Sequence, residues 1–169
     1  EGIIKNIDGY MYVGNFKDDL MDGKGTYSYA NGDKFVGEFK NGKRNGKGTL
    51  SLSDGYTYTG EFKDDMKHGQ GTATYDRGEF KGDKYVGEFK KDLKHGQGNY
   101  IIYNGDVYVG QFIEGEIDGK GTITYLNKDT YTGDFKKGFM EGQGTYKSND
   151  GFKYVENTLF KLSNIFKSI

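Results

Sequence analysis

The sequence predicts an all-β fold: an elongated single-layer stack of antiparallel β-hairpins with a short C-terminal helix. Three observations predict it. Glycine supplies 29 of the 169 residues, where average usage would give about 12. Aromatic residues are abundant, with 15 Tyr and 12 Phe, whereas Pro, Cys and Trp are absent. Glycines and aromatic rings also recur at a nearly constant interval, which is typical of repetitive β structure.

The repeat is defined by two sets of glycines. A glycine two residues before a Phe recurs at intervals of 23, 23, 27, 23 and 23 residues, and the four extra residues of the long interval lie within residues 76–81. A Gly-x-Gly pair follows each of these glycines in the same rhythm. The predicted array covers residues 1–155, with repeats near 8–30, 31–53, 54–76, 81–103, 104–126 and 127–149 and a partial repeat at 150–156.

Each repeat contains two short strand patterns. In the segment Tyr85–Lys90, alternation places Tyr85, Gly87 and Phe89 on one face of a strand. Glycine weakens a strand interior, so its fixed position predicts a close approach by a neighbouring group. We therefore expect the Tyr and Phe rings of one strand to cover glycines of the next strand.

Turn residues separate the units. Asn-Gly and Asp-Gly pairs recur between repeats and favour tight hairpin turns, because both residues tolerate positive φ. Asn127-Lys128 replaces such a pair before the sixth repeat, which predicts a looser turn there. A two-stranded unit is marginal alone, so stacking of neighbours must build the core.

The unit YVGEFKKDLKHGQGNYII, from Tyr85, represents the shared pattern Y-x-G-x-F-x-x-x-x-x-x-G-x-G-T-x-x-x. This pattern resembles the MORN repeat, although the fifth position, often Trp in that family, is always Phe here. The resemblance implies a stack of antiparallel hairpins and a scaffolding role, often in cytoskeletal, ciliary or membrane-junction assemblies. It also implies an alternative, because MORN arrays occur as accessory regions of lysine methyltransferases and phosphatidylinositol-phosphate kinases.

The aromatic set is the candidate partner-binding site. Most of each ring is expected in the core, but a single-layer sheet cannot cover both of its faces. The remaining surface would form an aromatic, glycine-lined groove for a helix or an extended segment of another protein. The candidate groove residues are Tyr12, Phe16, Phe35, Phe39, Tyr58, Phe62, Tyr85, Phe89, Tyr108, Phe112, Tyr131 and Phe135.

The last segment, residues 157–169, changes period. Leu159, Leu162, Phe166 and Ile169 would share one face of a short amphipathic helix. Such a helix would cap the last hairpin, as repeat arrays require. The alternative is a docking or dimerisation helix, or one that contacts a membrane.

No residue set predicts catalysis, a cofactor or a metal. His68 and His95 occupy the same repeat position, which elsewhere holds Asp, Asn or Glu, so a polar edge explains them. The acidic pairs fall in connecting loops, where carboxylates are solvated. The 24 Lys and Arg balance 25 Asp and Glu, which weighs against nucleic-acid binding. Lysines 17, 40, 63, 90 and 136 predict either a solvated face with cross-strand ion pairs or a surface for acidic lipids.

These observations favour a non-catalytic scaffold that binds other proteins. The alternatives are the accessory region of a larger enzyme and a peripheral binder of acidic phospholipid membranes, and a homo-oligomer is a further candidate state. Without cysteine, a transmembrane segment or a signal peptide, we expect a cytoplasmic protein, with the cytoskeleton or cilium as its candidate site.

Overall fold

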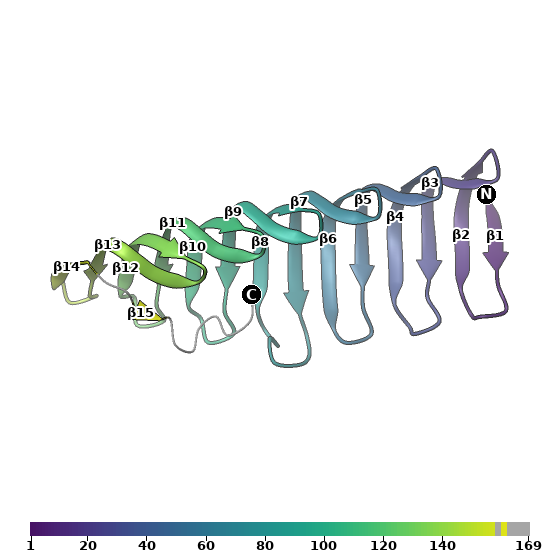
Figure 1. Ribbon diagram of the computed structural model, residues 1–169. Helices are drawn as coiled ribbons and strands as arrows, with labels where there is room; N and C mark the ends of the chain where they lie inside the picture. Colours follow the sequence, from purple (N-terminus) through teal and green to yellow (C-terminus); the bar gives the residue numbers. More distant parts are fainter. Residues whose placement is uncertain (158–159, 162–169) are drawn as a thin grey trace. The chain divides into compact units, whose positions relative to one another are not determined.

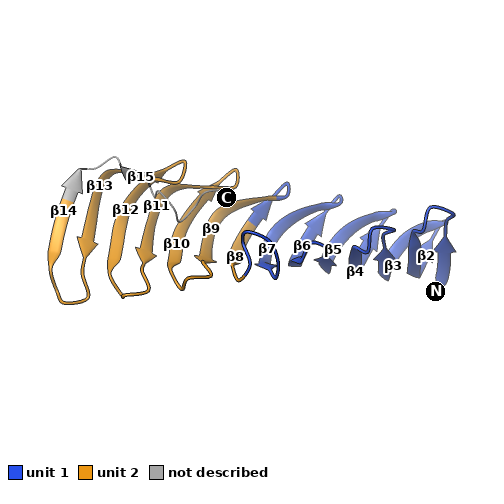
Figure 2. Ribbon diagram, turned by 90° about the horizontal axis from the view of Figure 1, so that it is seen from below, with its two compact units in different colours: residues 1–81, 89–92 blue, residues 82–88, 93–169 orange. Residues whose placement is uncertain are grey.

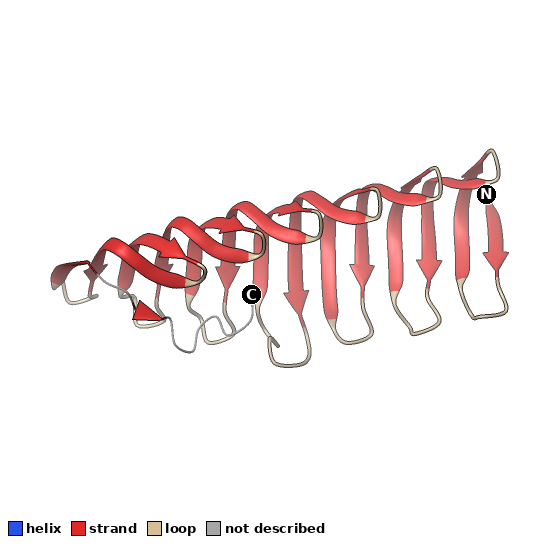
Figure 3. Cartoon of the chain, viewed as in Figure 1, coloured by secondary structure: helices blue, strands red, loops and turns tan. Residues whose placement is uncertain are grey.

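The computed structural model describes residues 1–157 and 160–161, and over these residues the chain forms strands, turns and loops but no helix (Figures 1 and 3). The predicted all-β class is therefore confirmed. Two compact units divide the chain, residues 1–81 with 89–92 and residues 82–88 with 93–169 (Figure 2). Each unit is described by itself.

Unit 1 is a single layer of antiparallel strands that pair in chain order. Its strands are β1 (Gly2–Lys5), β2 (Met11–Lys17), β3 (Leu20–Ser28), β4 (Lys34–Lys40), β5 (Lys43–Ser51), β6 (Tyr56–Lys63) and β7 (Met66–Tyr75). The strand β8 (Lys84–Lys90) contributes its last residues to this unit and its first residues to unit 2.

Unit 2 repeats the same arrangement. Its further strands are β9 (Leu93–Ile101), β10 (Val107–Ile113), β11 (Glu116–Thr124), β12 (Thr130–Lys136), β13 (Phe139–Lys147), β14 (Lys153–Asn157) and β15 (Phe160–Lys161). The strands β9 to β14 pair in chain order, and β15 pairs with β13. The predicted stack of antiparallel hairpins is thus present within each unit.

The register explains the glycine spacing. In the hairpin of β2 and β3, Gly14 lies opposite Gly25, and Gly37 of β4 lies opposite Gly25 on the other side. The equivalent pairs Gly110–Gly121 and Gly133–Gly144 occur in unit 2. One row of glycines therefore crosses the strands of each unit, where backbones approach without side chains between them.

Beyond each glycine pair the second strand bulges. Phe16 pairs with Met21, so Asn15 alone lies opposite residues 22–24 and the second strand carries extra length. Gly23 lies within this bulge with φ of 94°. The first glycine of each Gly-x-Gly therefore supplies a left-handed residue at a bend.

The tight hairpin turns lie within the repeats rather than between them. Both residues have positive φ at Asp18-Asp19 (50° and 60°) and at Asn41-Gly42 (49° and 79°), as a two-residue hairpin loop requires. The Asn-Gly connections between repeats are wider, and only their glycine is left-handed. At the connection expected to be looser, Lys128 takes that place with φ of 69° and donates its backbone N–H to Tyr125 O at 2.8 Å, so the turn keeps its form.

The C-terminal helix prediction is wrong where the structure describes the segment. Asn157 ends β14, and Phe160 and Lys161 pair opposite Met140 and Phe139 of β13. The free edge of β13 offers backbone partners that a short, marginal helix lacks. The helix-face residues Leu159, Leu162, Phe166 and Ile169 lie outside the described residues.

Candidate functional site

The predicted groove residues form the core rather than an open groove. Eleven of the twelve are at most 6% exposed, and Phe16 is half-buried. Tyr58, Tyr85 and Tyr108 are completely buried. These rings therefore hold the hairpins together, and the eleven buried rings offer little surface to a partner.

Each tyrosine ring lies over a glycine, as the sequence predicts. A Cβ atom added to Gly121 would lie 2.4 Å from Cε2 of Tyr108, and one added to Gly25 would lie 2.4 Å from Cε2 of Tyr12. Rings of successive repeats then meet edge to face. The Tyr108 ring is 5.4 Å from Phe112 in its own repeat and 5.3 Å from Phe135 in the next, between ring centroids. Such contacts are favourable beyond their burial.

The hydroxyls of four repeat tyrosines donate hydrogen bonds to backbone carbonyls beside the bulge. Tyr12 Oη donates to the carbonyl of Asn15 at 2.8 Å, and Tyr108 Oη donates to that of Gln111 at 3.1 Å. Tyr58 and Tyr85 make the same bond at 2.9 Å. Burial raises the pKa of Tyr58, Tyr85 and Tyr108 above the ordinary value. These hydroxyls stay protonated donors and are unsuited to act as bases.

Two cations lie over the rings of unit 1, on the face of the sheet that we call the inner face. The Arg44 guanidinium lies 5.3 Å from the Phe62 ring centroid, and its Nε is 3.4 Å from Asp65 Oδ1. Lys67 Nζ donates to Tyr56 Oη at 3.0 Å, and burial lowers the pKa of Lys67. Both side chains pack against the aromatic core with their alkyl stems and their charges. These two cations are therefore already engaged within unit 1.

A recurring aspartate links successive repeats, and the sequence reasoning missed it. Asp33, Asp83, Asp106 and Asp129 each accept a backbone N–H from the following connection at 2.8 Å. The second carboxylate oxygen of Asp83 accepts the Tyr100 hydroxyl at 2.7 Å. The available signal was an Asp two residues before the repeat aromatic in four repeats.

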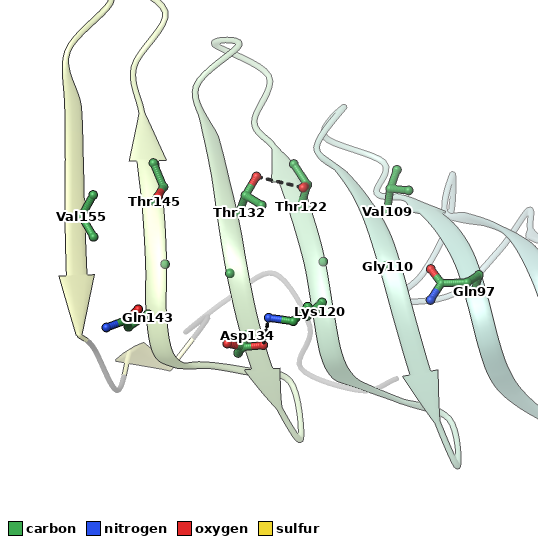
Figure 4. A pocket seen from close by; sticks show the side chains of 13 residues that line it. Gln97, Val109, Gly110, Lys120, Thr122, Thr132, Asp134, Gln143, Thr145 and Val155 are labelled. Carbon is green, nitrogen blue, oxygen red and sulfur yellow. Dashed lines mark hydrogen bonds and ion pairs between the residues drawn. The ribbon is translucent and has the colours of Figure 1, made fainter.

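The outer face of each unit is the face opposite to the rings, and it carries a set of accessible side chains. On unit 2, Val109, Thr122, Thr132, Thr145 and Val155 form one row across the strands (Figure 4). Gln97, Lys120, Asp134 and Gln143 form a second row, and glycines lie between the rows. We call the space between these rows the outer groove of unit 2; it encloses about 600 Å³. It is glycine-lined, as expected, but its walls are β-branched and polar.

Polar contacts order the walls of the outer groove. The hydroxyls of Thr122 and Thr132 bond to each other at 2.9 Å, and Lys120 Nζ lies 3.1 Å from Asp134 Oδ1. Val109 is 51% exposed and Val155 is 65% exposed. The groove therefore combines apolar methyl groups, neutral amides and an ion pair between two of its own residues.

The MORN repeat family matches the chain over residues 12–34, 35–55, 58–80, 85–107, 108–130 and 131–153. The chain belongs to the MORN repeat family. Each matched segment starts at the repeat aromatic and covers a hairpin with the connection that follows. MORN repeats are typically modules that bind proteins or membranes.

The other comparisons are distant. A search of curated proteins finds no match. Among solved structures, the TCP domain of SAS-4 (dCPAP) from Drosophila melanogaster, in complex with a proline-rich motif of Ana2 (dSTIL), is 12% identical. The match covers 93% of this chain and 89% of that chain, with a TM-score of 0.48.

The lysines and acidic residues at fixed positions of the MORN repeat make few ion pairs with one another among the described residues. Lys17, Lys40, Lys63 and Lys90 are exposed, and Lys136 pairs with Asp118 at 3.0 Å. Glu38, Glu61 and Glu88, which follow the repeat glycine, accept backbone N–H groups of the bulges at 3.0 to 3.3 Å. These N–H groups lose ladder partners at the bulge, so the carboxylates satisfy them.

The two histidines sit at the bulged strands. Tyr58 Oη lies 3.4 Å from the His68 carbonyl, and Tyr85 Oη lies 3.4 Å from the His95 carbonyl. Over residues 1–157 and 160–161, no group of three His, Cys, Asp or Glu residues could hold a metal ion. Over the same residues, no helix has the length and apolarity to cross a membrane.

Proposed function

We propose that this MORN array is a non-catalytic scaffold that binds a partner protein through the outer groove of unit 2. The proposal rests on one observation, which is the separation of the side chains into a buried set and an accessible set. Nearly all of the repeat aromatic residues are buried in the core, whereas the accessible residues of the outer groove form an ordered wall of methyl groups, amides and one ion pair.

The groove suits an extended or flat partner segment. The hydrogen bond between Thr122 and Thr132 uses their hydroxyls, so the first wall offers mostly methyl groups. Lys120 and Asp134 neutralise each other, and Gln97 and Gln143 add amide donors and acceptors. An apolar row beside a polar row is the arrangement of a protein-binding surface, and the neutral wall favours an uncharged segment.

The membrane alternative has weaker support in the described residues. In unit 1, the exposed lysines 17 and 63 lie beside the acidic turns Asp18-Asp19 and Asp64-Asp65. Mixed signs at one edge reduce attraction to acidic lipids. A role in a cytoskeletal or ciliary assembly, in the cytoplasm, is part of the proposal and is supported by the family resemblance.

The test compares partner capture by three full-length proteins. Wild type, the double variant Thr122→Lys/Thr132→Lys and the matched control Thr124→Lys are used as baits in a native extract, with crosslinking and quantitative mass spectrometry. Thr124 is exposed on the same strand and the same face, outside the groove.

We expect wild type and Thr124→Lys to capture the same proteins, and the double variant to lose at least about 90% of them, because two buried, unpaired charges cost several kcal/mol at an interface. Equal capture by all three baits would refute the groove as the binding site. Conversion of a metabolite by the purified chain would refute the non-catalytic role.

A further inference from the structure

The outer face of unit 1 carries a row of alternating charge that the scaffold proposal does not use. Lys24 of β3 lies opposite Glu38 of β4, and Lys47 of β5 lies opposite Glu61 of β6. Read across the four strands, the row is positive, negative, positive, negative. Lys24, Lys47 and Glu61 are exposed, and Glu38 is half-buried.

These four charges have no ion-pair partner within the described part of the chain. The ion pairs there are Arg44–Asp65, Lys120–Asp134 and Lys136–Asp118. Glu38 Oε2 accepts the Lys47 backbone N–H at 3.0 Å, and Glu61 Oε1 accepts that of Gln70 at 3.3 Å. One oxygen of each carboxylate is held in place by the bulge, and the other is available to a partner.

A row of β-branched residues runs beside the charged row, one glycine away along each strand. Its register joins Val13 to Thr26, Thr26 to Val36, Val36 to Thr49, Thr49 to Thr59 and Thr59 to Thr72. The hydroxyls of Thr49 and Thr59 bond to each other at 3.0 Å. Val13 is 39% exposed and Val36 is 47% exposed, so this row leaves apolar surface in water.

We propose that the outer face of unit 1 binds the same face of a second copy of the chain, about a two-fold axis parallel to the strands between β4 and β5. Rotation about this axis reverses the order of the strands but keeps the position along them, so each row faces the same row of the second copy. Lys24 then meets Glu61 of the second copy, and Lys47 meets Glu38, with both contacts occurring twice. The β-branched rows meet each other and exclude water.

The charge order selects this axis and this unit. A two-fold axis perpendicular to the strands would set Lys24 against Lys24 and Glu38 against Glu38, which is repulsive. In unit 2 the equivalent row reads Glu88, Gln97, Gln111, Lys120, Asp134 and Gln143. Lys120 and Asp134 already neutralise each other at 3.1 Å, and Glu88 alone does not make an alternating row for a second copy.

The size of the surface predicts a weak dimer. Six strands at about 4.8 Å and four residues at about 3.4 Å give a face of about 400 Å² per copy. The total of about 800 Å² falls below the roughly 1,200–2,000 Å² of stable complexes. We therefore expect self-association that depends on concentration and salt, with a dissociation constant of about 10⁻⁴ M.

The first test is sedimentation equilibrium of the full chain from about 10 μM to about 1 mM. Wild type should dimerise, and 0.5 M salt should weaken the dimer several-fold by screening the four pairs. Lys47→Glu should weaken it at least tenfold, because two attractive contacts become repulsive. Lys47→Gln should have a smaller effect, and it should fold, since Gln70, Gln97 and Gln143 occupy this repeat position naturally.

The second test restores complementarity. In Glu38→Lys/Lys47→Glu the row reads positive, positive, negative, negative, and the same axis again matches opposite charges. This swap should regain the wild-type dissociation constant if its melting curve shows a folded protein. Lys147→Glu, at an exposed position of β13 in unit 2 outside the outer groove, is the matched control and should dimerise like wild type.

Three results would overturn the proposal: a wild-type monomer at 1 mM, equal dimerisation of Lys47→Glu and wild type, or a folded swap variant that stays as weak as Lys47→Glu. If the swap variant unfolds, two other results decide: the salt effect, and a dimer affinity that falls from wild type to Lys47→Gln to Lys47→Glu. Partner capture by the outer groove of unit 2 is a separate readout, so failure of the dimer leaves the scaffold proposal untouched.

Discussion

The inner and outer faces of the same strands differ in how much the repeats vary. On the inner face, every complete repeat places Tyr or Phe, then Gly, then Phe, and nearly all these rings are buried. On the outer face, the residue after the repeat glycine is Asn15, Glu38, Glu61, Glu88, Gln111 or Asp134. The inner face meets the same packing demand in each hairpin, whereas the outer face is free to differ. We therefore propose that recognition uses the outer face, which the aromatic repeat supports from the other side.

The largest expected contrast between the faces comes from removing side chains. Phe112→Ala should lower the free energy of unfolding by about 4 kcal/mol, because a completely buried ring leaves a cavity. Val109→Ala, on the outer face of the same strand and 51% exposed, should cost less than about 1 kcal/mol. Urea unfolding measures both. Equal losses would show that the outer face is also packed.

The second contrast adds a methyl group. Gly121→Ala should cost about 2–3 kcal/mol, because the new Cβ would lie 2.4 Å from Tyr108 Cε2 and force that ring to move. The neighbouring outer-face change Thr122→Ala should cost less than about 1 kcal/mol. Thermal and urea unfolding compare the two variants. A Gly121→Ala protein as stable as wild type would contradict the covering of glycine by tyrosine.

A smaller effect should follow from removing one hydroxyl from the inner face. Tyr108→Phe loses the bond to the Gln111 carbonyl at 3.1 Å and should cost about 1 kcal/mol. Phe35 occupies the equivalent position naturally, so the ring itself should still fit. The unfolding midpoint in urea gives the value. A loss as large as that of Phe112→Ala would mean that the ring position depends on this bond.

The aspartates that join the repeats should make stability depend on pH. A backbone N–H bond from Ser53 lowers the pKa of Asp33, and bonds from Tyr146 and Asn149 lower the pKa of Asp129. Because the folded pKa lies below the unfolded value, the contribution is present above the ordinary carboxyl pKa of about 4 and is lost as pH falls through the folded pKa.

The urea midpoint should therefore fall steadily below about pH 4, and by less in Asp33→Asn, whose amide does not titrate. This is the smallest of the four effects, since both carboxylates lie at the surface. An identical pH profile for Asp33→Asn and wild type would remove Asp33 from the explanation.

Sequence reasoning predicted the strands and their repeat because glycine and aromatic spacing is a local signal repeated six times. It also predicted that rings cover glycines. It expected part of the aromatic set to line an open groove, whereas these rings are buried. Alternation assigns residues to faces but does not show how far the bulge at Gly23 and its equivalents bends the sheet around the rings. It missed Asp106, whose partner at Leu126 is set by the stacking of two repeats. The helix prediction at Phe160 failed because a free strand edge competes with a short helix.

The most direct test of the central claim, that recognition uses the outer face, is site-specific photocrosslinking in the native extract. A photoreactive residue replaces Thr132 in the outer groove, and in a second protein it replaces Thr124, which is also exposed but lies outside the groove. The account predicts crosslinked partner proteins from position 132 and few or none from position 124. Equal crosslinking at the two positions, or partners captured only from position 124, would contradict it.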